Sequence, residues 1–245
     1  MTSKNFMVIL FWLNGIMLFS QNTSIKVTYR IYLDKDEIIE ESIKNAREKS
    51  YFHELYLSSL EEYKNYTFTL LHKDSVSEFY LSRYLPEPKM STKSLKKKDF
   101  VMGGYTGVVY QLNNRVYKYN PLSNLFAYFP FFSDWELTNE HKEIDGKLCY
   151  KANGYNQVVF KEKTFKHSVV AWYCPQLPYN TGPMGYGGLP GMILEIRIRN
   201  ATFIAEKIEF NTEDEIDVEF FKKHKKIELE ELNKRIEEEM QMLKE

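Results

Sequence analysis

The feature that most constrains the fold of this chain is a segment rich in proline and glycine, residues 175–191, between two apolar runs. Proline fixes φ and lacks an amide donor, and glycine weakens regular elements, so the segment predicts a stiff loop. Gly188 and Gly191 flank Leu189 and Pro190, which favours a tight turn at that point. It is not a phosphate-binding loop, because Pro190 takes the last glycine position of the GxGxxG spacing.

The runs on either side of this loop, and most of the chain before it, alternate apolar and polar residues as half-buried strands do. Aromatic residues make up 16% of the chain, which also favours strands. Asn113 and Asn114 separate two such runs and predict a tight hairpin, because Asn tolerates positive φ. The predicted strands lie at 23–34, 66–74, 75–85, 108–120, 125–129, 147–153, 168–174, 191–200 and 201–210.

Residues 37–50 and 212–245 instead show helical spacing of apolar residues. Residues 37–50 predict an N-terminal helix, and residues 85–98, which are rich in Lys and Pro, predict a polar surface loop. Thr212 and Glu215 have the spacing of a capping box, so residues 212–245 predict a C-terminal helical segment of one helix or two. That helix packs on the sheet, extends into solvent or forms a dimer seam; two heptads are too few for a coiled coil. The predicted fold class is mainly β (α+β), antiparallel, with one helix near each end.

The first 20 residues have the pattern of a signal peptide. Lys4 precedes an apolar run from Phe6 to Phe19, and Ser20 is a small residue at the expected cleavage position. The run is shorter than the roughly 20 residues that span a bilayer, although a retained anchor is the alternative. Cleavage would leave a β domain at 21–211 followed by the helical segment, with no later transmembrane helix and a periplasmic or otherwise exported location.

Charge and motif spacing exclude several classes of function. The net charge of −1 gives no field that would favour nucleic acid. The five histidines lack the spacing of metal ligands, and no cofactor motif or nucleophile elbow is present. Cys149 and Cys174 are the two cysteines, which in an exported protein predicts a disulfide; two separate buried thiols are the alternative. Cys174 with His141 or His167 is the one candidate for a thiol-dependent enzyme.

The sequence GGLPGMILEI resembles the signature of the GLPGLI family of exported proteins from Gram-negative bacteria. Upstream, TNEHKEIDGKLCYKA and VVAWYCPQLPYNTGPMG resemble further elements of the family, and Trp135 lies where the family tends to place a Trp. The resemblance covers about residues 135–200, and Cys174 departs from the pattern. It implies export, a cell-envelope setting and a β-rich fold, with no established reaction. A looser analogy to periplasmic carrier proteins implies a strongly curved sheet or half-barrel.

A non-catalytic ligand-binding, carrier or assembly role is therefore the expected function, with an apolar ligand or an envelope protein as the partner. Aromatic side chains on a stiff loop provide contact area at small entropic cost. The alternatives are a hydrolase or thiol enzyme that uses Cys174, and a structural or interaction protein whose aromatic residues fill the core. The candidate binding residues are Trp172, Tyr173, Tyr179, Tyr186, Gly188, Leu189, Pro190 and Gly191.

We expect the mature protein to begin at Gln21, because Ser20 ends the apolar run as a small residue. N-terminal sequencing of protein isolated from the cell envelope checks this. A protein that keeps Met1, or that stays in the cytoplasm, would contradict the prediction.

Overall fold

The computed structural model describes residues 24–34, 53, 54, 57, 66–82, 107–121, 123–160 and 163–242. The predicted signal peptide at 1–20, the predicted helix at 37–50 and the predicted loop at 85–98 lie outside the described residues. Within the described part, no helix is both long enough and apolar enough to cross a membrane.

The described elements are mostly strands, which confirms a mainly β fold. The strands are β1 (Ile25–Leu33), β2 (Thr67–Lys73), β3 (Val76–Leu81), β4 (Val109–Leu112), β5 (Arg115–Asn120), β6 (Leu125–Pro130), β7 (Glu136–Ile144), β8 (Lys147–Phe160), β9 (Lys163–Cys174), β10 (Met192–Ile198), β11 (Ala201–Phe210) and β12 (Lys225–Glu228). The helical elements are η1 (Pro183–Gly185), α5 (Val218–Lys223) and α6 (Leu229–Met242).

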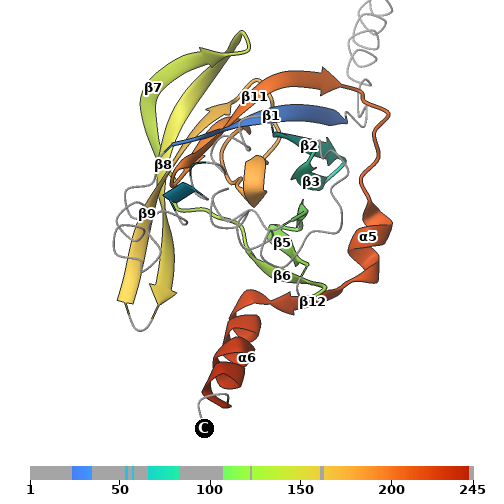
Figure 1. The fold of residues 1–245 in the computed structure, drawn as a ribbon. Helices are drawn as coiled ribbons and strands as arrows, with labels where there is room; N and C mark the ends of the chain where they lie inside the picture. Colours follow the sequence, from blue (N-terminus) through green and yellow to red (C-terminus); the bar gives the residue numbers. More distant parts are fainter. Residues whose placement is uncertain are drawn as a thin grey trace, which may run out of the picture.

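The described strands form one sheet in the order β12-β6-β5-β4-β3-β2-β1-β11-β10-β9-β8-β7. Its strand pairs are antiparallel except for the parallel pair of β12 and β6. The sheet is open and curves around a central space that the chain between β9 and β10 enters (Figure 1).

The connection from β6 to β7 shows why the sheet curves. These consecutive strands lie ten places apart in the strand order, which would separate them by roughly 48 Å in a flat sheet. Residues 131–135 alone join them, and from Pro130 to Glu136 an extended chain reaches at most about 22 Å. The two ends of the sheet must therefore turn toward each other.

The turns between neighbouring strands contain residues with positive φ. Asn113 and Asn114 join β4 to β5 with φ of 52° and 57°, which confirms the hairpin, and Asp74 turns between β2 and β3 at φ 56°. The turn between β10 and β11 lies at Arg199 and Asn200, with the positive φ of 55° at Arg199.

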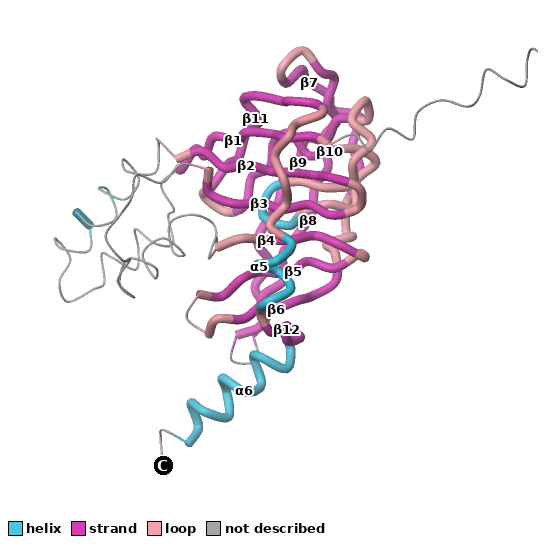
Figure 2. Tube along the Cα trace, turned by 90° about the vertical axis from the view of Figure 1, so that its right-hand side faces the viewer, coloured by secondary structure: helices cyan, strands magenta, loops and turns pink. Residues whose placement is uncertain are grey.

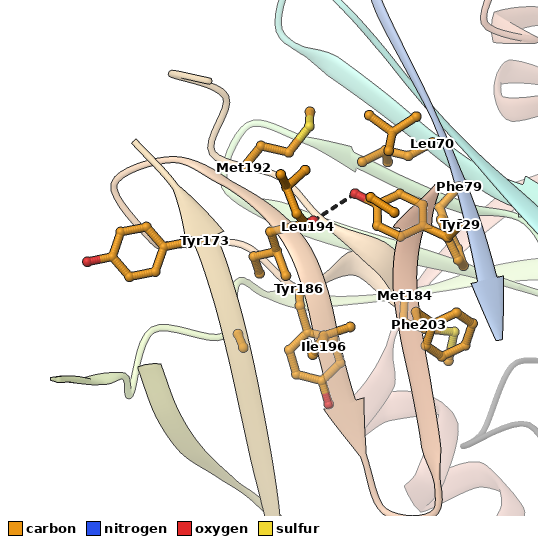
Figure 3. Close-up of a cluster of buried hydrophobic side chains, with 14 of the residues drawn as sticks. Tyr29, Leu70, Phe79, Tyr173, Met184, Tyr186, Met192, Leu194, Ile196 and Phe203 are labelled. Carbon is orange, nitrogen blue, oxygen red and sulfur yellow. Dashed lines mark hydrogen bonds between the residues drawn. The ribbon is translucent and has the colours of Figure 1, made fainter. Parts of the chain in front are cut away.

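The core lies on the inner face of the curve. Figure 3 shows Tyr29 among buried side chains from several strands, with its hydroxyl donating to the Ile193 carbonyl at 2.7 Å. Phe68 stacks on Phe79 at 5.3 Å between ring centroids, and Phe203 meets both rings edge-on. The aromatic enrichment in the sequence is thus used, in large part, to fill this curve.

Two predictions for the strands and the C-terminal segment need correction. Strand β7 was missed, because ELTNEHKEI is polar and mostly exposed at one edge of the sheet and so lacks apolar alternation. The segment 212–245 is not one helix: residues 212–217 are irregular, and β12 separates α5 from α6. Thr212 caps no helix, and its hydroxyl bonds to Asp214 instead. Asp217 caps α5, with its side chain accepting from the Phe220 amide at 2.9 Å.

The C-terminal arm, residues 211–228, crosses the outside of the sheet before it joins the edge. Lys26 and Asp214 form an ion pair at 2.7 Å near the start of the arm. Further along, Phe221 of α5 packs on Tyr110 and Phe126 at 5.0 and 5.3 Å between ring centroids. Helix α6 then extends away from the sheet (Figure 2).

A buried carboxyl group fixes the point where the arm meets β3 and β4. Glu78 is 6% exposed, accepts from the Asp217 amide at 3.1 Å, and lies 2.9 Å from the Tyr110 hydroxyl. That hydroxyl is also 2.9 Å from the Asp217 carbonyl, and its single proton cannot serve both acceptors. Protonation of Glu78 would let its carboxyl group donate to Tyr110 and leave the hydroxyl proton for the Asp217 carbonyl. Burial raises the pKa of Glu78, against the lowering effect of its two hydrogen bonds.

We expect Glu78→Gln to gain stability relative to the natural protein as the pH rises above the ordinary Glu pKa of 4.5. In that range the folded protein keeps a proton that the unfolded chain has lost, so the natural protein loses stability as the pH rises toward the raised pKa. Gln mimics the protonated form and does not titrate. Denaturant unfolding across the pH range measures the difference in unfolding free energy.

Glu213→Gln, at an exposed position of the same arm, is the matched control and should follow the natural protein. A difference for Glu78→Gln that stays flat or falls with rising pH would show that Glu78 is ionised in the fold.

Candidate functional site

The Pro/Gly loop between β9 and β10 lies inside the curve of the sheet. Pro183, Met184 and Gly185 form η1 and are buried, as are Tyr186 and Gly187. Element η1 contacts β3, β4 and β5. The loop therefore fills much of the interior of the curved sheet. Its surface, called the floor below, faces the space between the first and last strands of the sheet.

Polar side chains of the sheet hold the loop at several backbone positions. Gln111 on β4 donates to the Tyr186 carbonyl at 3.1 Å and accepts from the Thr181 hydroxyl. The Trp135 indole donates to the Gly187 carbonyl at 2.7 Å. The Asn156 amide donates to the Tyr186 hydroxyl, and burial raises the pKa of Tyr186 to about 12. The loop has no regular ladder, so these bonds satisfy backbone groups that would otherwise be buried unpaired.

Two glycines are required by close backbone or side-chain approach. Gly185 has φ +84°, and a Cβ there would lie 2.4 Å from a methyl group of Val116. Gly191 has φ +150°, and its Cβ would lie 2.3 Å from the Cys174 carbonyl oxygen. The loop therefore leaves β9 and enters β10 through a contact that admits no side chain.

An open groove of about 790 Å³ lies above this floor, between the two ends of the curved sheet. One wall comes from β5, β6 and the connection to β7, and the opposite wall from β8 and β9. Both ends of the sheet contribute polar and apolar groups. Its lining includes Lys118, Phe129, Phe131, Phe132, Asp134, Tyr155, Asn156, His167, Met184, Tyr186, Arg199 and Leu229.

The structure separates the residues that the sequence grouped as a candidate site. Tyr186 reaches the groove, and Tyr179 lies elsewhere, with its ring 5.0 Å from that of His72. Tyr173, Leu189 and Gly191 belong to the buried core, whereas Gly188 and Pro190 are exposed. Trp172 is half-buried, with the Lys142 ammonium 4.3 Å from its ring centroid.

Trp172 and Tyr173 point to opposite faces because neighbours in a strand alternate. Tyr173 pairs with Tyr150 on the same face as Ala171, while Trp172 lies opposite Lys151 and Glu195. The two residues therefore cannot line one surface together.

The two cysteines lie opposite each other on neighbouring strands. Tyr150 pairs with Tyr173, so the antiparallel register brings Cys149 against Cys174. Both are buried, and both thiols are free in this structure. Burial, together with the neighbouring Cys174 thiol, raises the pKa of Cys149 to about 12. The predicted disulfide stays a prediction.

Groove residues that the sequence did not single out include Phe129, Phe131, Phe132 and Asn156, and His167 was named only as a possible partner of Cys174. The stretch FPFF at 129–132 was a signal, since a strand that ends in such an aromatic cluster beside proline is unusual. Nothing in the sequence pointed to Asn156 beside His167, because only the register Asn156↔His167 brings the two residues together. Among the described residues, no group of three His, Cys, Asp or Glu side chains is placed to hold a metal ion.

Comparison of the sequence with known families gives one short match. A family described as a protein of unknown function (Porph_ging) matches residues 159–195, which include β9, the Pro/Gly loop and the start of β10. This match is consistent with the resemblance to the GLPGLI family. No curated protein matches the sequence.

Comparison of the fold finds similar solved structures at low sequence identity. PNGF-II in a P21 crystal form matches with a TM-score of 0.50 and 13% identity, over 86% of this chain and 32% of that chain. A C2 form of PNGF-II matches with a TM-score of 0.48 and 14% identity, over 84% and 31%. This chain thus spans about a third of the length of PNGF-II, and the likeness concerns the fold alone.

Gly191→Ala should destabilise the protein by more than about 2 kcal/mol, because its Cβ would meet the Cys174 carbonyl at 2.3 Å. Gly146→Ala is the control: its φ is +66°, but nothing lies within 4 Å of the added Cβ. The control should cost only roughly 1 kcal/mol for the backbone conformation. Equal losses of unfolding free energy for the two variants would contradict the packing argument.

Cys149 and Cys174 should form a disulfide once the protein is in an oxidising compartment. The bridge would close a loop of about 25 residues and stabilise the fold by roughly 3 kcal/mol in the chain-entropy model. Thiol titration of denatured, unreduced protein from the envelope tests this. Finding two free thiols there would end the idea.

Proposed function

We propose that this protein is an exported, non-catalytic binding protein of the cell envelope that holds an amphipathic ligand in the groove. The observation that carries the proposal is the groove itself, next to the Pro/Gly loop. Its volume of about 790 Å³ falls within the roughly 300–1,000 Å³ that small-molecule sites occupy.

The lining favours a ligand with both apolar and polar parts. Phe129, Phe131 and Phe132 offer aromatic surface on one wall, and Asn156 and His167 offer hydrogen-bonding groups on the other. The groove is open to solvent, so part of a bound molecule stays hydrated. An aromatic wall and a polar wall together suit an amphipathic molecule better than a purely apolar one.

The floor of the groove is fixed before any ligand arrives. Tyr186 is held at its carbonyl by Gln111 and at its hydroxyl by Asn156. Neighbouring Gly185 lies against Val116 with no room for a side chain. A preorganised floor loses little conformational entropy on binding, which favours affinity.

The thiol-enzyme alternative has less support. Cys174 is fully buried beneath the loop. The adjacent Cys149 thiol has its pKa raised to about 12, whereas a nucleophilic cysteine requires a lowered one. The Nδ1 atom of His141 bonds to the Asn139 carbonyl oxygen and not to a thiol.

Native mass spectrometry of the protein purified from its own envelope tests the proposal, together with titration of the amphipathic dye 1-anilinonaphthalene-8-sulfonate. We expect a co-purified small molecule and saturable dye binding, both weakened at least about tenfold by the double change Phe129→Ala and His167→Ala. Tyr32→Ala is the control, because Tyr32 is 49% exposed on β1 and lies outside the groove.

Dye binding that is the same in the groove variant and in the control, with no co-purified molecule, would favour the structural or interaction alternative. Turnover of a peptide, lipid or glycan that is lost on Cys174→Ser would instead overturn the non-catalytic claim.

A further inference from the structure

A second, smaller cavity lies beside the ends of strands β2 to β5, where two turns meet the Pro/Gly loop. It has a volume of about 370 Å³ and is formed by the β2–β3 turn, the β4–β5 turn and residues 178–180 of the Pro/Gly loop. It shares Phe131 with the groove but no other lining residue. Its volume is near the lower end of the roughly 300–1,000 Å³ range of ligand sites.

A row of polar side chains crosses the inner face of the sheet at this cavity. His72 pairs with Ser77, and Ser77 pairs with Gln111, across β2, β3 and β4. Ser77 and Gln111 are buried, and His72 is half-buried. Burying polar groups costs free energy, so apolar residues would be expected on an inner face.

The three members of this row make different contacts. Gln111 holds the Pro/Gly loop through Thr181 and Tyr186. The His72 Nδ1 atom and the Ser77 hydroxyl bond to each other at 2.8 Å. The His72 ring also meets the Tyr179 ring at 5.0 Å between centroids, which places the pair directly against the Pro/Gly loop. Burial lowers the pKa of His72, so the ring is a neutral hydrogen-bonding group.

The rest of the lining adds neutral amides and an aromatic face. Asn113, Asn114 and Asn180 offer amide donors and acceptors, and Tyr179 and Phe131 offer rings. Asp74 carries the only formal charge among the described lining residues. An anion is therefore disfavoured, and the apolar surface is too small for a lipid chain. Hydroxyl groups, which both donate and accept, match this set of amides, carboxylate and imidazole.

We propose that this cavity binds a small polyhydroxylated ligand, such as one or two sugar residues, with the Tyr179 ring against its C–H face. The polar row forms the floor, and the asparagines of the turns meet the hydroxyl groups at the rim. The two turns join paired strands, with Asp74, Asn113 and Asn114 at φ of 56°, 52° and 57°, so their conformation is set before a ligand binds. Asn180 is fixed by accepting a hydrogen bond from the Gly188 amide.

The test uses the purified full chain and four probes, each alone: glucose, galactose, mannose and N-acetylglucosamine. Saturation-transfer NMR detects binding and calorimetry measures Kd. At least one sugar should bind saturably, and Tyr179→Ala should weaken it about tenfold through loss of the ring. Tyr179→Phe keeps the ring and should weaken binding less.

Asp74→Asn provides a variant that keeps the fold, since Asn adopts positive φ readily, and it removes a charged acceptor. It should also weaken sugar binding. His167→Ala in the groove should leave sugar binding unchanged, which separates this site from the groove. No saturable binding of any of the four sugars, or binding that survives both Tyr179→Ala and Asp74→Asn, would overturn the proposal.

Discussion

The short link between β6 and β7 is the constraint on which the rest of the structure depends. Five residues join strands from opposite regions of a 12-stranded sheet, so the sheet must curve until those regions approach. The curvature creates a concave inner face. The link, which contains Phe132 and Trp135, connects the two approaching regions of the sheet. A Cβ on Gly154 would come within 2.7 Å of Phe132, which shows how closely the link lies on β8.

The concave face then determines the role of the Pro/Gly loop. An empty curve of this size would leave Tyr29, Phe79 and Phe203 exposed to water, at a cost of about 25 cal/mol for each Å² of apolar surface. The loop enters the curve and covers part of this surface. Gln111 and Trp135 donate to its buried carbonyl groups, and Asn156 donates to the Tyr186 hydroxyl. The groove and the smaller cavity are the parts of the concave side that the loop leaves open.

The sequence predicted the strands that alternate and the turns that need positive φ, such as Asn113 and Asn114. These features depend on local backbone chemistry, which a sequence displays directly. It did not predict β7, whose polar residues lie at an exposed edge, or β12, which is a strand because β6 pairs with it. The candidate site was grouped by proximity along the chain. Trp172 and Tyr173 show the limit of that grouping, because adjacent residues of a strand face opposite ways.

The position of β1 in the middle of the sheet has a consequence for the time at which this chain can fold. Ile25 pairs with Phe210 on one side and His72 on the other. The first described strand, β1, therefore cannot complete its pairing until β11, near the end of the β domain, is available. Pairing at such sequence separation is slow, because loop-closure entropy is lost before the contacts form. A chain that emerges from its N-terminus cannot complete its core until β11 is also free. If such a chain were exported during its synthesis, it would cross the channel before its core had formed.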